Sequence, residues 1–173
     1  MNVMFSVIIT LNIYSKARNM LPSGRYTQYN IINAASLYNI TANQNQILSI
    51  RLENYFYPEH FANGLTTVSG ITLNLASGRK YSFEDLFVPG NNYEEVLNKI
   101  IEQQIEEEDI PLFEQYPGIT GQEEFYLTLD KLVIIYQEYD LTPGYYGVLE
   151  FDIPYNEIES VINPEGPIAK LIE

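Results

Sequence analysis

The chain of 173 residues has no cysteine and no tryptophan, one histidine, and 9 basic residues against 23 acidic ones. The lack of cysteine excludes disulfides, zinc–thiolate sites and thiol catalysis. The formal charge of −14 repels nucleic acid and anionic membranes, so neither is expected as a partner. The charge favours a cationic partner, although an acidic surface also keeps a protein soluble without any partner.

Long apolar runs are also missing, so no direct membrane insertion is expected. The apolar stretch 3–13 is not preceded by lysine or arginine. Six of its apolar residues fall on odd positions, with Ser6, Thr10 and Asn12 between them: Val3, Phe5, Val7, Ile9, Leu11 and Ile13. This alternation predicts a β-strand rather than a signal peptide. We expect any export signal or anchor of the natural protein to lie outside this sequence. The length fits a single domain over 1–173.

Alternation of apolar and polar residues predicts further strands at about 37–41, 48–57, 71–75, 125–129 and 149–153. The run 132–136 is almost wholly apolar, which is typical of a central strand covered on both faces. A turn at Ser82–Asp85 resembles a capping box and would bury Phe83, Leu86 and Phe87. Turns are also expected at 43–46 and at Ser77-Gly78.

One main amphipathic helix is predicted at about 91–105, with Asn91 and Glu94 as its start signal. Its apolar stripe consists of Tyr93, Val96, Leu97, Ile100, Ile101 and Ile105. A short C-terminal helix follows Pro154 and contributes Ile158, Val161 and Ile162. The order of strands, helix and strands predicts an α+β fold with an antiparallel sheet.

No residue pattern indicates catalysis, a metal site or a cofactor. His60 lacks the strand–turn–helix setting of a nucleophile site, and a role in a loop or in packing is favoured for it. One histidine without cysteine disfavours a transition-metal site. No glycine-rich phosphate loop is present, because Gly144 and Gly147 flank aromatic residues. We therefore expect a protein that is not an enzyme and has no cofactor.

Acidic residues gather between Lys99 and Lys131 with no basic residue among them: Glu102, Glu106, Glu107, Glu108, Asp109, Glu114, Glu123 and Glu124. A solvated charged face or a surface that steers a cationic partner is favoured. A glycosidase would need two carboxylates facing each other across a cleft, which consecutive glutamates at a helix end do not imply. The spacing also lacks the Asp-x-Asp-x-Asp-Gly form of a calcium loop.

The loop 139–148 joins two strong predicted strands and carries Pro143, Tyr145 and Tyr146. Proline and glycine constrain the backbone there, and aromatic side chains on a constrained loop are typical of a surface that binds protein or sugar. These three residues are therefore the candidate partner-binding residues. The alternative is a long hairpin whose tyrosines fold back onto the sheet.

Two sets of segments resemble a known family. The first consists of 63–68, 71–81 and the run Phe83-Glu84-Asp85-Leu86-Phe87. The second consists of 125–127, 134–136, Tyr139, Pro143, Gly147 and Ile153-Pro154-Tyr155. Together they resemble the DUF3298 domain over 61–165, and the strands of 1–60 are similar to its companion, DUF4163. The chain departs from the family pattern at 59–64 and at Pro143-Gly144-Tyr145-Tyr146-Gly147, where the aromatic residue is moved along.

The resemblance implies a bacterial, extracytoplasmic domain, secreted or membrane-anchored. DUF3298 domains occur in the ectodomains of lysozyme-sensing anti-sigma factors, where this loop belongs to the lysozyme-facing surface. The implied function is non-catalytic recognition of a protein related to the cell wall, such as a basic lysozyme. The alternative is an accessory module of a polysaccharide deacetylase-type enzyme that binds glycan or peptidoglycan. A fold can host many functions, so the resemblance alone does not identify the ligand.

Overall fold

The computed structural model describes residues 31–173. The strand predicted over 3–13 lies outside the described residues. The strands are β1 (Ile31–Gln44), β2 (Ile47–Pro58), β3 (Leu65–Asn74), β4 (Glu124–Leu127), β5 (Lys131–Tyr136) and β6 (Leu149–Pro154). The helices are α2 (Tyr93–Glu107), α3 (Tyr155–Ile158) and α4 (Pro167–Ile172), with 3₁₀ turns η1 (Glu84–Leu86) and η2 (Gly144–Tyr146).

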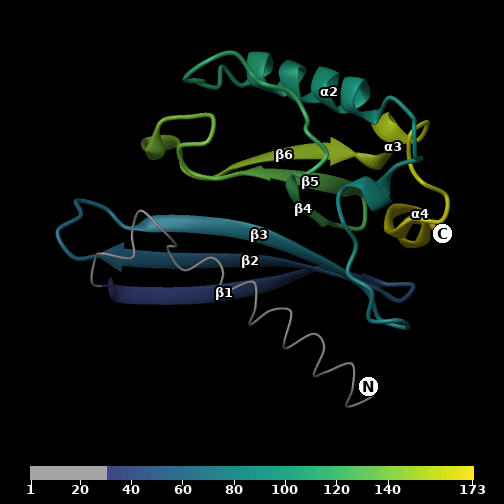
Figure 1. Cartoon of the computed structure of the whole chain (residues 1–173), viewed down its shortest axis with the longest axis horizontal. Coiled ribbons are helices and arrows are strands. Elements are labelled where there is room, and N and C mark those ends of the chain that lie inside the picture. The colour runs from purple at the N-terminus through teal and green to yellow at the C-terminus, as the bar shows by residue number, and fades with distance from the viewer. Residues whose placement is uncertain (1–30) are drawn as a thin grey trace.

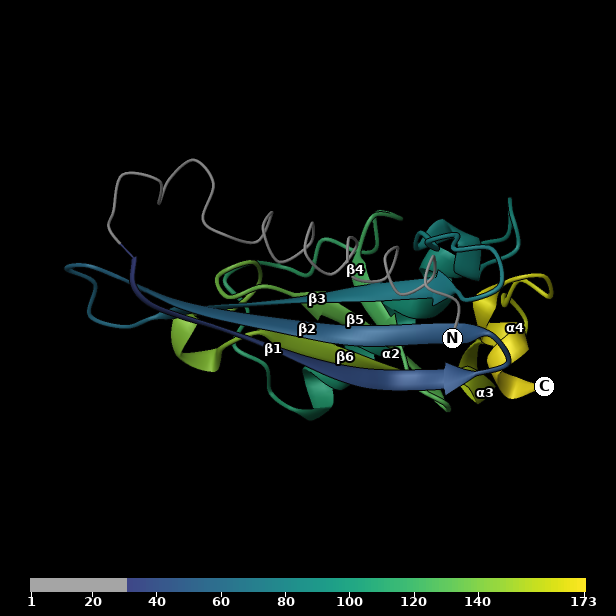
Figure 2. The same ribbon diagram turned by 90° about the horizontal axis from the view of Figure 1, so that it is seen from below.

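The strands form two antiparallel sheets, with orders β1-β2-β3 and β4-β5-β6. Figure 1 shows three layers, in which the second sheet lies between the first sheet and α2, and α3 and α4 close one end. Seen from below in Figure 2, the first sheet runs along the long axis of the molecule. The predicted α+β class with antiparallel strands, one main helix and a short C-terminal helix is confirmed.

The central strand β5 is covered on both faces, as its apolar run predicts. Leu132 and Ile134 belong to the main core, together with Leu97 and Ile101 of α2. Val133 faces the other way and packs with Val68 of β3 in a smaller cluster between the two sheets. Both faces of β5 are apolar because one face meets the helix layer and the other meets the first sheet.

The segment between β3 and α2 supplies aromatic side chains to the main core. Phe83 and Phe87 are buried, and the ring of Tyr93 at the start of α2 stacks on Phe87 with centroids 4.3 Å apart. The carboxylate of Asp85 accepts hydrogen bonds from the backbone N–H and the hydroxyl of Ser82. The predicted turn and its buried residues are confirmed.

Two helix ends differ from expectation. The residue before α2 is Asn92 rather than Asn91, and the side chain of Asn92 donates to Glu95 instead of bonding the helix backbone. Ile162 lies beyond α3 and forms a β-bridge with Phe87, because the chain turns back across η1. The last helix, α4, starts at Pro167, which suits a first helical position since proline has no N–H to leave unpaired.

The buried tyrosines predict a loss of stability in alkali. Burial raises the pKa of Tyr116, Tyr126 and Tyr155 above the ordinary value for a phenol. Below about pH 10 the folded and the unfolded protein both keep these phenol protons. Above that pH only the unfolded chain releases them. The free energy of unfolding should therefore fall above about pH 10, by about 1.4 kcal/mol per pH unit for each proton.

Urea unfolding followed by circular dichroism at a series of alkaline pH values checks this expectation. The hydroxyl of Tyr155 donates to the carbonyl of Thr128, so Tyr155→Phe is a suitable variant. Its stability should decline less steeply with pH than that of the parent, because one titrating group is gone. Equal slopes in the two proteins would contradict the role given to Tyr155.

Candidate binding surface

The loop 139–148 joins β5 to β6 and is held in shape by its own backbone. The N–H of Tyr146 donates to the carbonyl of Pro143 at 2.9 Å, and the N–H of Gly147 donates to Gly144. Gly147 has a φ of 84°, a conformation that favours glycine. Pro143 therefore starts the 3₁₀ turn η2 and Gly147 ends it, as the pattern of Pro and Gly predicts.

The tip of this loop presents aromatic side chains to solvent. The side chain of Tyr145 is 82% exposed and that of Tyr146 is 36% exposed. The ring of Tyr139 lies against Gly144, where an added Cβ would come within 2.2 Å of ring atoms. A larger residue at 144 would push this ring away. The alternative in which both tyrosines fold back onto the sheet is wrong for Tyr145, which packs against no sheet.

The base of the loop is anchored. Thr142 is buried, and the carboxylate of Asp140 accepts a hydrogen bond from the backbone N–H of Gln137. The carbonyl of Leu141 accepts from the backbone N–H of Phe113 at 2.9 Å. This last bond ties the loop to the segment that follows α2.

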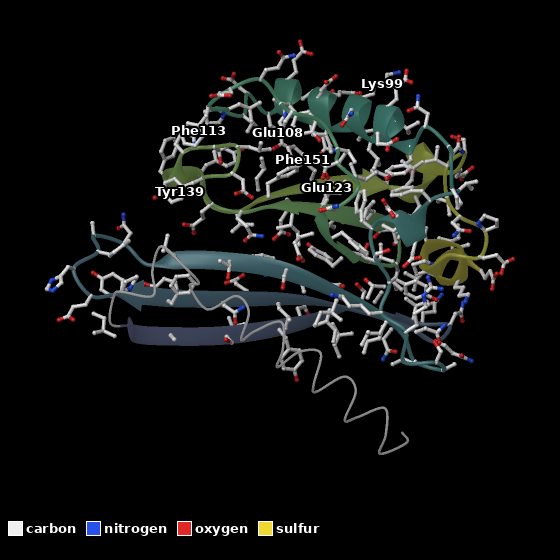
Figure 3. The ribbon with its side chains drawn as sticks, in the orientation of Figure 1. Lys99, Glu108, Phe113, Glu123, Tyr139 and Phe151 are labelled. Atoms are coloured by element: carbon white, nitrogen blue, oxygen red, sulfur yellow. The ribbon has the colours of Figure 1, made fainter. Side chains whose placement is uncertain are left out.

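Phe113 brings a further exposed ring to the same end, and its side chain is 57% exposed. Figure 3 shows Phe113 beside Tyr139, with Glu108 at the nearby end of α2. We call the four exposed rings the aromatic end: Phe113, Tyr139, Tyr145 and Tyr146. The sequence predicts the tyrosines from their loop but not Phe113, because tertiary contacts, including the bond to Leu141, place it there.

Exposed carboxylates flank the aromatic end, and we call them the acidic flank: Glu106, Glu107, Glu108, Asp109 and Glu114. Of the other acidic residues of the predicted cluster, Glu102 is exposed on α2 one turn before Glu106, and Glu123 and Glu124 bond the backbone. The carboxylate of Glu123 accepts from the N–H and hydroxyl of Thr120 and from the N–H of Gly121, and Glu124 accepts from the N–H of Gly70. Glu123 and Glu124 therefore serve the fold. The acidic flank is exposed to solvent, and within it Glu107 accepts a hydrogen bond from the side chain of Gln103.

Hollows of the surface lie elsewhere. One of roughly 440 Å³ lies between 80–84 and 121–125, and another of roughly 470 Å³ runs from Ser82 to Glu94. The side chain of His60 is exposed in the turn after β2. Within residues 31–173, no three His, Asp or Glu side chains are grouped to hold a metal ion. The helices described there are all too short or too polar to cross a bilayer.

Comparisons with known proteins agree with the resemblance. Residues 84–156 match the model of a family described as "Protein of unknown function (DUF3298)". This range holds both the loop 139–148 and Phe113. The resemblance to DUF3298 is thus confirmed, while the DUF4163-like part over 1–60 and the boundary at 60/61 stay predictions.

A stretch of 50 residues is 44% identical to part of the anti-sigma-V factor RsiV of Bacillus subtilis (strain 168). This stretch makes up 28% of this chain and 18% of that protein. A DUF3298 structure from Bacteroides fragilis NCTC 9343 has a TM-score of 0.65 at 20% identity, covering 93% of this chain and 65% of that chain. A DUF3298 protein from Pseudomonas aeruginosa PAO1 has a TM-score of 0.54 at 19% identity, covering 80% and 63%. Both solved structures share the fold, and this chain spans just under two thirds of each.

Proposed function

We propose that this chain is a non-catalytic, extracytoplasmic recognition domain of the anti-sigma-factor type. It binds a basic protein related to the cell wall, a lysozyme being the first candidate, through the aromatic end. The observation that carries the proposal is the meeting of the exposed rings and the acidic flank at one end of the molecule. The sequence similarity to an anti-sigma factor supports this class of function.

The aromatic end has the side chains that dominate protein interfaces. Tyrosine and phenylalanine bury a large area on contact and lose few rotatable bonds, and tyrosine adds a hydroxyl that can form a hydrogen bond. Tyr145 leaves most of its surface in water, so its burial against a partner would be a large gain in apolar contact. The bond from Phe113 to Leu141 and the turn at Pro143 hold the rings in place before a partner arrives.

The acidic flank suits a basic partner. Its five carboxylates are exposed, and between Lys99 and Lys131 the sequence has no positive charge to neutralise them. A field of one sign beside a contact surface raises the rate of encounter with a partner of opposite charge, more than it lowers the rate of dissociation. The rings thus provide most of the binding affinity, and the carboxylates increase the association rate.

Calorimetric titration with a basic animal-type lysozyme at moderate salt tests the contact surface. We expect saturable binding in the micromolar range or tighter, and a loss of at least tenfold in affinity in the double variant Tyr145→Ala, Tyr146→Ala. Leu129→Ala is the control, because Leu129 is an exposed apolar residue outside the aromatic end and outside β1. Its affinity should equal that of the parent.

Three other outcomes would count against the proposal. Binding that disappears with salt but ignores the double variant means charge attraction alone. An equal loss in the Leu129 control means that the surface is misplaced. No binding removes lysozyme as the partner, and titration with peptidoglycan fragments then tests the accessory glycan-binding module, in which tyrosine rings would stack on sugars.

The acidic flank has its own readout. In the triple variant Glu106→Gln, Glu107→Gln, Glu108→Gln, the association rate should fall severalfold and depend less on salt, with the dissociation rate nearly unchanged. Stopped-flow measurement over a range of salt concentrations separates the two rates. A faster dissociation with an unchanged association rate would assign these carboxylates to direct contact instead of steering.

A further inference from the structure

The two sheets have four outer edges, and side chains close three of them. Backbone N–H and C=O groups along an open edge are a template for another strand, so natural proteins cover or interrupt such edges. At the outer edge of β3, the side-chain amide of Gln137 both accepts from the N–H of Val68 at 3.0 Å and donates to its carbonyl at 2.7 Å. The carboxylate of Glu138 accepts from the N–H of Thr66.

The edges of the second sheet are closed in the same manner. At β4, the N–H of Leu127 donates to the hydroxyl of Ser49, and its carbonyl accepts from the hydroxyl of Thr41. At β6, the carbonyl of Asp152 accepts from the side-chain amide of Gln104 on α2. Side chains therefore interrupt the row of backbone groups at both of these edges.

The outer edge of β1 is different. This strand has 14 residues and pairs with β2 on one side, and within residues 31–173 no element pairs with its other side. It contains no charged residue and no proline, in a chain with a net charge of −14. Charge and proline are the usual means by which edge strands prevent pairing, and β1 has neither.

Apolar side chains lead across the first sheet to this edge. Opposite residues of paired strands share a face, and the row Ile71, Ile50, Ile40 runs from β3 through β2 to β1. Ile71 and Ile50 are buried, but Ile40 is 50% exposed. In the same manner, Tyr38 is 67% exposed beside the buried Leu52. One more strand beside β1 would cover both rows where they now end in solvent.

We propose that β1 is the contact surface for a second copy of this chain, paired antiparallel with its own β1. An antiparallel pair of identical strands obeys a two-fold axis, so each edge closes the other and the assembly stops at two copies. The strand without charge is the place where two copies of net charge −14 can meet without opposing like charges in the ladder. The pairing is centred on Leu37, near the middle of β1, so that Leu37 of one copy lies opposite Leu37 of the other, and it gives a continuous sheet of six strands.

Sedimentation or light scattering of the full chain tests the assembly. We expect a monomer–dimer equilibrium that shifts towards dimer as salt increases, because salt screens the repulsion between two acidic copies. The double variant Tyr38→Lys, Ile40→Lys should be monomeric at all salt concentrations. Leu129→Lys is the control, because Leu129 is a similarly exposed apolar residue outside β1, and it should leave the dimer intact.

The absence of cysteine allows a second test of where the copies meet. Leu37→Cys carries the only thiol of its chain and should form a dimer linked by a disulfide under mild oxidation, whereas Leu129→Cys should not. A monomer at all concentrations and salts would overturn the proposal. A dimer that survives the lysine variant, or one linked equally well through position 129, would overturn the assignment to β1.

Discussion

Replacing Gly70 with alanine is expected to lower the free energy of unfolding by about 3 kcal/mol or more. Gly70 lies in the middle of β3 where that strand crosses β4, and an added Cβ would lie 1.5 Å from the backbone carbonyl oxygen of Phe125. Backbone cannot move aside as a flexible side chain can, so the two sheets would have to separate locally. Urea unfolding followed by circular dichroism measures the loss.

Gly90→Ala is the control for this substitution. Gly90 has nothing within 4 Å of its added Cβ, but its φ of +77° carries the ordinary cost of a side chain in that conformation. We expect a loss of about 1 kcal/mol there. If Gly70→Ala were no more costly than Gly90→Ala, the close approach of β3 to β4 would not exist in solution.

Replacing Arg51 with leucine should have the next largest effect, a loss of about 3 kcal/mol. The guanidinium of Arg51 on β2 donates to Glu150 on β6 through Nε at 2.9 Å and Nη2 at 2.7 Å, and through Nη1 to Glu53 at 2.7 Å. The hydroxyl of Tyr126 donates to the other oxygen of Glu150. Without Arg51, two carboxylates between the sheets would have no cation. The expected loss lies at the low end of the range for buried ion pairs, because the side chains of Arg51 and Glu150 keep about a quarter of their surface in water.

A rescue experiment distinguishes lost charge from lost packing. Glu150→Gln in the Arg51→Leu background removes one of the two stranded charges while keeping the shape of the side chain and an acceptor for Tyr126. The double variant should recover a substantial part of the stability. An unchanged deficit would mean that the stem of Arg51, and not its charge, joins the sheets.

Much of the fold could be predicted because it depends on local patterns. The stripe of α2, the apolar run of β5 and the turn at Ser82 each identify their elements without tertiary information. The prediction for β1 covered only 37–41 of Ile31–Gln44, because an exposed edge strand has no buried face to impose alternation. The division into two sheets could not be predicted, since strand pairing depends on tertiary contacts, such as the close approach of β3 to β4 at Gly70.

Only part of the candidate surface could be predicted from the sequence. Pro143, Tyr145 and Tyr146 could be selected because proline and glycine reveal a shaped loop in the sequence itself. Their role as partner-binding residues stays a prediction. Phe113 and the acidic flank lie 25 or more residues before the loop, and tertiary contacts such as the hydrogen bond from Phe113 to Leu141 bring them to it. No local signal distinguishes Glu108, at the surface, from Glu123, which is occupied by its own turn.

The side chains that replace a neighbouring strand at the edge of β3 also couple the two sheets mechanically. Gln137 and Glu138 immediately precede the loop that carries the tyrosines, and they grip the backbone of β3 at Val68 and Thr66. A force applied to the tyrosines by a bound partner would be transmitted to the first sheet through these three hydrogen bonds. β3 pairs in turn with β2, and β2 with β1. The loop 139–148 is thus connected through β3 and β2 to the edge strand β1.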